Sequence, residues 1–171
     1  MNVPNHQGEE AQAAEEAVHI EIEIEDRVEM LVVTPTGEGG FVELIRSKFD
    51  LSEEVHLFER DHEEPLAHHH GRGRKHIRVV GHCCHEVSLA VRFDHETRHH
   101  HFRPSATIFR ALQWAVSKHG FRLDAMAAAK ANLILPGADA PLPREDVLGK
   151  YVKPDHCALV VDLTLKDFTN G

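Results

Sequence analysis

Hydrophobic residues occupy every second position between residues 18 and 24, with His and Glu between them. This period of two predicts a half-buried β-strand, and a second β-rich run at 28–34 predicts its hairpin partner. Apolar residues then recur at helical spacing over 41–49, which predicts a helix. Short apolar runs at 55–58 and 77–80 predict two more strands, separated by a polar loop of His, Gly and Arg.

The second half of the chain repeats this order of elements. Alternation over 87–93 predicts a strand, which turns at 94–97 and returns through Phe102. Thr107 is expected to cap a helix whose apolar stripe ends before Gly120, a residue type that often follows a helix. Short strands at 133–135 and 159–165 complete the pattern.

Both halves therefore predict a hairpin, a helix, a strand, a loop and a strand. A helix of this kind must pack on the sheet to bury its apolar stripe, so the fold class expected is α+β, with two small domains in tandem. Each domain is expected to be a mixed sheet packed on one main helix. The boundaries expected are a disordered acidic tail at 1–17, domains at 18–83 and 87–166, a linker at 84–86 and a C-terminal tail at 167–171.

Charge narrows the range of functions. The 171 residues include 28 acids and 19 Lys or Arg, for a net charge of −9, and residues 1–26 contain eight of the acids and no Lys or Arg. Nothing in this balance predicts the basic surface that nucleic-acid binding requires. Because no run is apolar enough to span a bilayer and the start lacks the features of a signal peptide, we expect a cytoplasmic protein without membrane partners.

Cysteine and histidine supply the only candidates for reactive or metal chemistry. Three cysteines, Cys83, Cys84 and Cys157, are too few and odd in number for a disulfide framework, which indicates a reducing compartment. Cys157 precedes a core strand and is expected to be a small buried hydrophobe. Twelve of the 16 histidines lie between His56 and His101, where they offer a pH response or a loose metal site.

The His-Cys-Cys-His stretch at 82–85 is the strongest metal candidate, because imidazole and thiolate bind zinc. On an extended chain only alternate side chains share a side, and neither a CxxC pair nor an HExxH helix is present. The sequence therefore predicts no metal, no cofactor and no enzyme activity. A His/Cys metal binder stays open as an alternative.

Four stretches of the second half resemble ubiquitin in the right order. They are Pro-Ser-Ala-Thr-Ile at 104–108, Asn-Leu-Ile-Leu-Pro-Gly at 132–137, Asp-Val-Leu-Gly-Lys-Tyr at 146–151 and the alternating leucines at 159–165. The tandem arrangement is similar to the two-domain, interferon-stimulated ubiquitin-like modifier and to the BilA-type modifiers of bacterial antiphage conjugation operons. This resemblance implies two β-grasp domains.

The resemblance also implies a protein modifier that is conjugated through its C-terminal glycine, Gly171. The residues expected to guide recognition of the tail are Lys166, Asp167, Phe168, Thr169 and Asn170. The partners implied are an activating enzyme, a conjugating enzyme, a deconjugating peptidase and target proteins. The tail departs from that of ubiquitin, because it ends in Phe-Thr-Asn-Gly with a single glycine.

A candidate partner surface comprises Ile134, Val160 and Trp114, although Trp114 could instead cover the seam between the domains. Asp162 occupies part of the position of ubiquitin's apolar receptor patch, so recognition by ubiquitin receptors is not expected. The alternative function is a non-covalent ubiquitin-like adaptor, which would tolerate the loss of Gly171.

Overall fold

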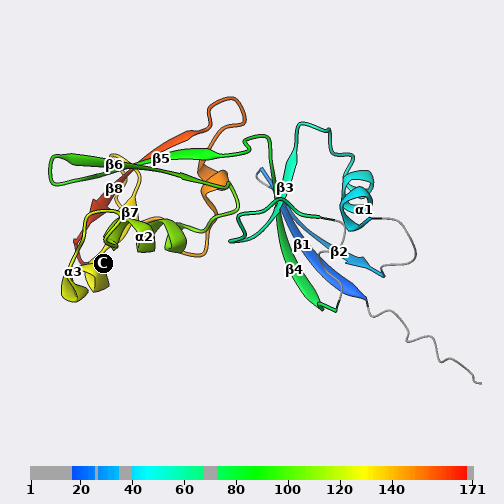
Figure 1. Ribbon diagram of the computed structural model, residues 1–171, viewed down its shortest axis with the longest axis horizontal. Helices are drawn as coiled ribbons and strands as arrows, with labels where there is room; N and C mark the ends of the chain where they lie inside the picture. Colours follow the sequence, from blue (N-terminus) through cyan, green and yellow to red (C-terminus); the bar gives the residue numbers. More distant parts are fainter. Residues whose placement is uncertain (1–16, 26, 35–39, 68–72, 169–171) are drawn as a thin grey trace, which may run out of the picture.

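Two small α+β domains lie side by side in the computed structural model (Figure 1), which confirms the predicted fold class. The structure describes residues 17–25, 27–34, 40–67 and 73–168. Almost all of the predicted N-terminal tail therefore lies outside the described residues. Within the described ranges, no helix has the length and apolar character needed to cross a membrane.

The first domain has a four-stranded sheet in the order β2-β1-β4-β3. Its strands are β1 (Val18–Ile24), β2 (Arg27–Val33), β3 (His56–Glu59) and β4 (His76–His82). β1 and β4 run parallel, whereas both outer pairs are antiparallel. Alternate residues of β1 face helix α1 (Phe41–Lys48), whose Phe41 and Ile45 are buried against the same face. The two-residue period of β1 thus produces the core that the sequence predicts.

The second domain repeats this topology in the order β6-β5-β8-β7. Its strands are β5 (Val87–Phe93), β6 (Glu96–Phe102), β7 (Asn132–Ile134) and β8 (Ala158–Thr164). Helix α2 (Ile108–Val116) covers the inner face, and the Thr107 hydroxyl caps it by accepting from the Arg110 N–H at 3.2 Å. Parallel strands β5 and β8 occupy the centre of the sheet.

Two details differ from the sequence expectation. Helix α2 ends at Val116, well before Gly120, and the Ser117 hydroxyl donates to the Trp114 carbonyl at 2.7 Å as the helix ends. Gly120 instead allows a close approach, since a Cβ atom there would lie 2.3 Å from the Ala115 carbonyl oxygen. Short helices α3 (Ala125–Lys130) and η1 (Leu148–Tyr151) follow. The alanine-rich α3 buries no residue, so it has no apolar stripe to reveal it in the sequence.

The junction between the domains is built on the outer face of the first sheet. Phe58 and Val80 are paired on that face, away from α1, yet they are only 0% and 4% exposed. The Arg103 guanidinium lies 5.5 Å from the centre of the Phe58 ring, and the His85 ring lies 6.0 Å from it. The second domain therefore covers an apolar patch that a single domain would leave in water.

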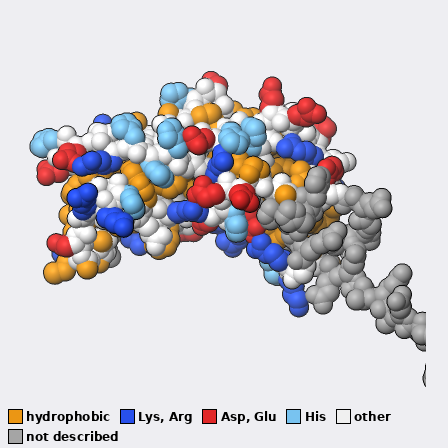
Figure 2. Space-filling model, viewed as in Figure 1, with side chains coloured by type: hydrophobic (Ala, Val, Ile, Leu, Met, Phe, Trp, Pro, Cys, Tyr) orange, Lys and Arg blue, Asp and Glu red, His pale blue; other side chains and the backbone are white. Residues whose placement is uncertain are grey.

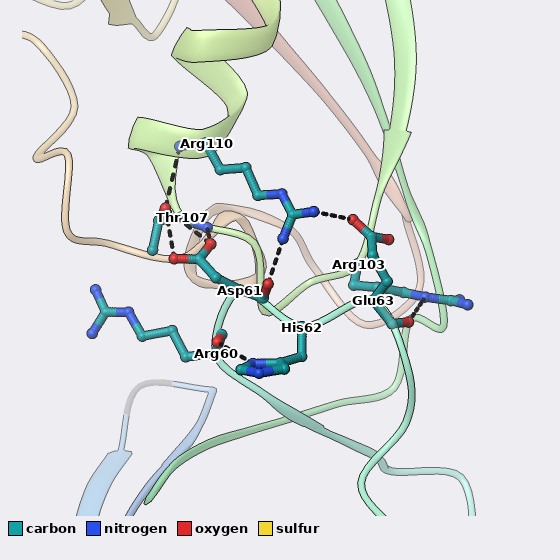
Figure 3. A network of polar contacts seen from close by, with 7 residues as sticks. All are labelled: Arg60, Asp61, His62, Glu63, Arg103, Thr107 and Arg110. Atoms are coloured by element: carbon teal, nitrogen blue, oxygen red, sulfur yellow. Dashed lines mark hydrogen bonds and ion pairs between the residues drawn. The ribbon is translucent and has the colours of Figure 1, made fainter.

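Polar contacts surround this apolar patch (Figure 3). The Asp61 carboxylate accepts hydrogen bonds from the backbone N–H and the hydroxyl of Thr107, at 2.8 and 3.0 Å. Arg110 donates to the Asp61 carbonyl and pairs with Glu63 at 2.7 Å. Arg103 donates to the Glu63 carbonyl at 2.8 Å. Side chains and backbone of the β3–β4 connection thus bind the start of α2 directly.

The connection between the domains corrects the prediction for cysteine. Cys84 and Cys157 form a disulfide, so the sequence expectation that Cys157 is a small buried hydrophobe is wrong; the residue is bonded and exposed. The two residues are 73 positions apart, and only the parallel pairing of β5 with β8 brings them together. Of the described cysteines, Cys83 is free.

Candidate functional site

The C-terminal segment follows the end of β8, a central strand whose inward residues Leu159, Val161 and Leu163 are buried. After Thr164 the backbone N–H of Lys166 donates to the Thr164 hydroxyl at 3.1 Å. The Lys166 ammonium lies 5.5 Å from the centre of the Phe168 ring. The chain therefore leaves a rigid strand and becomes exposed within two residues.

Only part of the predicted recognition tail can be placed. Lys166 and Asp167 are exposed and Phe168 is half-buried. Thr169, Asn170 and the expected conjugation residue Gly171 lie outside the described residues.

The outer face of the second sheet lies beside this exit point. Ile134 and Asp162 are register partners on β7 and β8, and Val160 lies one step away on the same face at 44% exposure. The structure thus brings together two of the three residues of the candidate partner surface. Trp114 lies on the opposite side of the sheet, on α2.

The centre of this face is an ion pair. Arg92 of β5 binds Asp162 of β8 in a bidentate manner, at 2.6 and 3.0 Å. The hydrogen bond with the Asp162 carboxylate raises the pKa of the Arg92 guanidinium above its ordinary value. The apolar side chains of Ile134 and Val160 therefore flank a charged centre, which suits a partner with both polar and apolar contacts.

A hollow of about 440 Å³ adjoins the same end of β8. Its lining includes Asp162, Leu163 and the β5–β6 turn, in which Asp94 and His95 both have left-handed backbone angles of φ 47° and 69°. Asp tolerates this conformation comparatively well, so the turn fits a tight hairpin. The β5–β6 turn and the Arg92–Asp162 pair therefore line one hollow near the end of β8, where the C-terminal segment begins.

Trp114 packs within its own domain. Its ring stacks on His100 at 5.0 Å between ring centres and meets Phe102 edge-on at 6.1 Å. Both partners belong to edge strand β6, so the indole covers the open side of the second core. Contacts at the seam between the domains come instead from Thr107, which caps α2, and from Arg110 within the helix.

The His-Cys-Cys-His stretch has a structural explanation. His82 is buried, and its Nδ1 accepts from the Cys84 backbone N–H at 2.8 Å while Nε2 lies 3.1 Å from the Val152 carbonyl. This pattern fixes the neutral tautomer with its proton on Nε2. Cys84 is in the disulfide, and among the described residues no group of three or more His, Cys, Asp or Glu is placed to hold a metal ion.

The residues that join the domains give little sign of that role in the sequence. Asp61, Glu63, Arg103 and Arg110 appeared to be ordinary surface charges, because nothing local reveals that they face one another across 40 or more positions. The one available signal was the charged run at 59–64 directly after an apolar strand.

Comparison with known proteins identifies the second domain. Residues 88–166 match the sequence model of the family described as BilA ubiquitin-like domain 2. A search of curated proteins finds no match to the chain. The matched region contains nearly all of β5 and extends two residues beyond β8, and the first domain has the same strand order as the second. The second domain therefore belongs to the family of BilA ubiquitin-like domain 2, and the chain contains two β-grasp domains in tandem.

Proposed function

We propose that this protein is a ubiquitin-like modifier, attached to target proteins through the carboxylate of Gly171 and acting in antiphage defence. The observation that carries the proposal is the family match of the second domain together with the exposed chain that leaves its central strand β8. A C-terminal glycine suits this role, because a residue without Cβ can enter a narrow active-site channel.

In the proposed reaction the Gly171 carboxylate attacks the α-phosphate of ATP on an activating enzyme and releases pyrophosphate. An enzyme thiolate displaces AMP from the acyl adenylate to form a thioester, which passes to the cysteine of a conjugating enzyme. A target amine then attacks the thioester, loses a proton and releases the thiol as an amide bond forms. The modifier supplies the acyl group and no catalytic residue, and a peptidase would cleave the amide bond with water, which releases the Gly171 carboxylate and the target amine.

The surface around the tail exit supports selective recognition by such enzymes. The enzymes would contact Phe168 and Lys166 on the tail. They would also contact the Arg92–Asp162 pair and Val160 on the outer face of the sheet. Because this surface differs from an apolar receptor patch, dedicated enzymes fit it better than those of ubiquitin.

Co-expression with the activating and conjugating enzymes of the same genome tests the proposal. Mass spectrometry should find Gly171 joined to lysine side chains in the wild-type protein, and these adducts should be absent when Gly171 is deleted. His119→Gln is the matched control, because it changes an exposed residue outside the tail and keeps the terminal glycine. Active cognate enzymes that form neither thioester nor adduct would contradict conjugation.

A second candidate function, a non-covalent adaptor, is favoured by the 44% exposure of Val160 on the sheet face. This function predicts that deletion of Gly171 leaves partner binding intact, whereas Val160→Asp abolishes it. The two variants therefore separate the adaptor from the modifier.

A further inference from the structure

Strand β2 is an edge strand whose apolar residues point away from the core of its own domain. Among the described strands it pairs with β1 alone, so the other edge of its backbone is open. Val28, Met30 and Val32 lie on its outer face and are 59%, 63% and 56% exposed. Its inner face begins with Arg27 and Glu29, which form an ion pair at 3.8 Å. We call Val28, Met30 and Val32 the β2 stripe.

The second domain shows that the β-grasp topology does not require this stripe. The β1–β2 and β5–β6 hairpins have the same register, so each residue of β2 has an equivalent in β6. The three residues of β6 equivalent to the β2 stripe are Thr97, His99 and His101. All three are polar, as expected for a face in contact with water. The apolar stripe is therefore particular to β2, and adjacent exposed apolar residues are typical of an interaction site.

The charges beside the β2 stripe are balanced. Glu21 and Glu23 lie next to it on β1. Glu21 is 3.9 Å from Arg78, and Glu23 is near Arg60 and Lys150. Figure 2 likewise shows acidic and basic side chains together in the middle of the face, where the domains meet. The surface around β2 therefore favours a partner that makes apolar contacts over a partner of strong charge.

The β2 stripe is complementary to itself across a two-fold axis. When two copies of β2 pair antiparallel with Met30 on the axis, the two Met30 side chains lie opposite each other, and Val28 of each copy lies opposite Val32 of the other. The strand contains neither proline nor lysine, and it pairs with β1 residue by residue without a bulge. The features that commonly block pairing at a sheet edge are thus missing from residues 27–33.

Charge does not oppose this register. On the inner face it places Glu29 opposite Leu31, and Arg27 opposite Val33, of the second copy, so no like charges are directly opposite. The two glutamates of β1 lie one strand farther back. The glutamates of the two copies are therefore three strand spacings apart, about 14 Å. This separation exceeds the screening length of about 8 Å at physiological salt.

We propose that β2 is a self-association site, where a second copy of this chain pairs antiparallel with the open edge and joins the two first-domain sheets. The open backbone groups of both strands gain hydrogen bonds, and the two β2 stripes bury each other. Figure 1 shows β2 in the first domain, away from the end of β8, so the C-terminal segments of both copies stay accessible. One pair of strands is a small interface, so the dimer is weak and depends on protein concentration.

Sedimentation equilibrium of the full-length protein at several concentrations measures the dissociation constant of the dimer. Met30→Lys places two like charges together on the axis and should weaken the dimer at least about tenfold. Leu44→Lys makes the same kind of change at an exposed residue of α1 and should leave the dissociation constant unchanged. Matched thermal melts should show that both variants remain folded. A wild type that stays monomeric up to about 1 mM, or a dimer that Met30→Lys does not weaken, would overturn the proposal.

Cysteine cross-linking under a mild oxidant tests the register, in a Cys83→Ser background that removes the free thiol. Met30→Cys should form a disulfide between two copies, because Cα atoms directly opposite in an antiparallel pair are roughly 4.5–5.5 Å apart. Val28→Cys and Val32→Cys should each stay monomeric alone and cross-link when mixed. His99→Cys, at the equivalent position of β6, is the control. Cross-linking of Met30→Cys no faster than that of His99→Cys would overturn pairing through β2.

Discussion

At the scale of single residues, Asp61 has the most informative position, because it belongs to the first domain and its side chain caps a helix of the second. It accepts the Thr107 N–H at 2.8 Å at the start of α2, where backbone N–H groups have no partner within the helix. Thr107 in turn accepts from the Arg110 N–H, so the two side chains cap the helix together.

Asp61→Ala should therefore destabilise the protein by about 0.5–2 kcal/mol, the usual cost of losing a helix cap. Urea unfolding followed by circular dichroism measures the change. The neighbouring exposed Glu64 provides the control, since Glu64→Ala should alter the free energy of unfolding by less than about 0.5 kcal/mol. Equal effects of the two substitutions would argue against the cap.

His56 gives the chain a predictable pH dependence. Burial lowers its pKa below the ordinary value of 6.5, and the neighbouring His85 and Arg46 lower it further. The unfolded chain therefore binds a proton at a pH where the folded His56 is still neutral, so this contribution to stability is lost as the pH falls through 6.5.

Measured by urea unfolding between pH 7.5 and 5.5, the loss of stability on acidification should be smaller in His56→Gln than in wild type. His119→Gln removes an exposed histidine and should retain the wild-type dependence of the free energy of unfolding on pH. If the free energy of unfolding of His56→Gln depended on pH as strongly as that of wild type, the lowered pKa of His56 would be contradicted.

At the scale of elements, the disulfide ties the linker before β5 to the start of β8. The two strands are parallel and pair from Ser88 with Ala158 onward, so the bond closes the end of the central pair. The Cys84 backbone also donates to buried His82, which reaches the Val152 carbonyl. The linker is consequently bound to the second domain along its first residues.

Cys157→Ser should lower the free energy of unfolding of the oxidised protein by about 2–4 kcal/mol, as expected for a bond across 73 positions. Reduction should lower the free energy of unfolding of the wild type to that of Cys157→Ser and leave that of the variant unchanged. Cys83→Ser, which removes the free thiol, should behave as wild type. Non-reducing peptide mapping that finds Cys83 in the bond would contradict the assignment.

At the scale of the whole molecule, the covered face of the first sheet decides whether the domains act as one unit. Phe58 is fully buried but lies outside the core around α1, so its burial comes from the second domain. Burial also raises the pKa of Glu23, which is near Lys150 of η1, in agreement with contact across the junction. A shared apolar patch of this kind couples the unfolding of two small domains.

Wild type should therefore unfold in one transition, whereas Phe58→Ala should separate the domains and yield two. The expected loss of free energy of unfolding is about 3–5 kcal/mol, the range for replacing a buried Phe by Ala. Val28→Ala is the control, since Val28 lies on the same face at 59% exposure and should have little effect. Calorimetry counts the transitions, and small-angle scattering should show a larger radius for Phe58→Ala. A single unshifted transition in Phe58→Ala would contradict the coupling.

Local pattern was sufficient to predict most of the elements. The alternation at 18–24 and 159–165 and the stripe after Thr107 correspond to β1, β8 and α2, because side-chain periods of 2 and 3.6 follow from backbone geometry. Helix α3 was not predicted, since it buries no residue and its alanines form no helical period of apolar and polar positions. The stop of α2 was misplaced because a serine hydroxyl, rather than Gly120, accompanies its end.

The sequence by itself determined the fold class and the resemblance of the second half to ubiquitin, both of which rest on patterns within a few tens of residues. Only the tertiary structure decided which distant residues meet. It joined Cys84 to Cys157, packed Trp114 against β6, brought the Asp61 carboxylate to the start of α2 and buried Phe58 beneath the second domain. The reason is physical: periodicity records whether a side chain faces a core, whereas contacts between domains depend on shape and charge brought together across the folded chain.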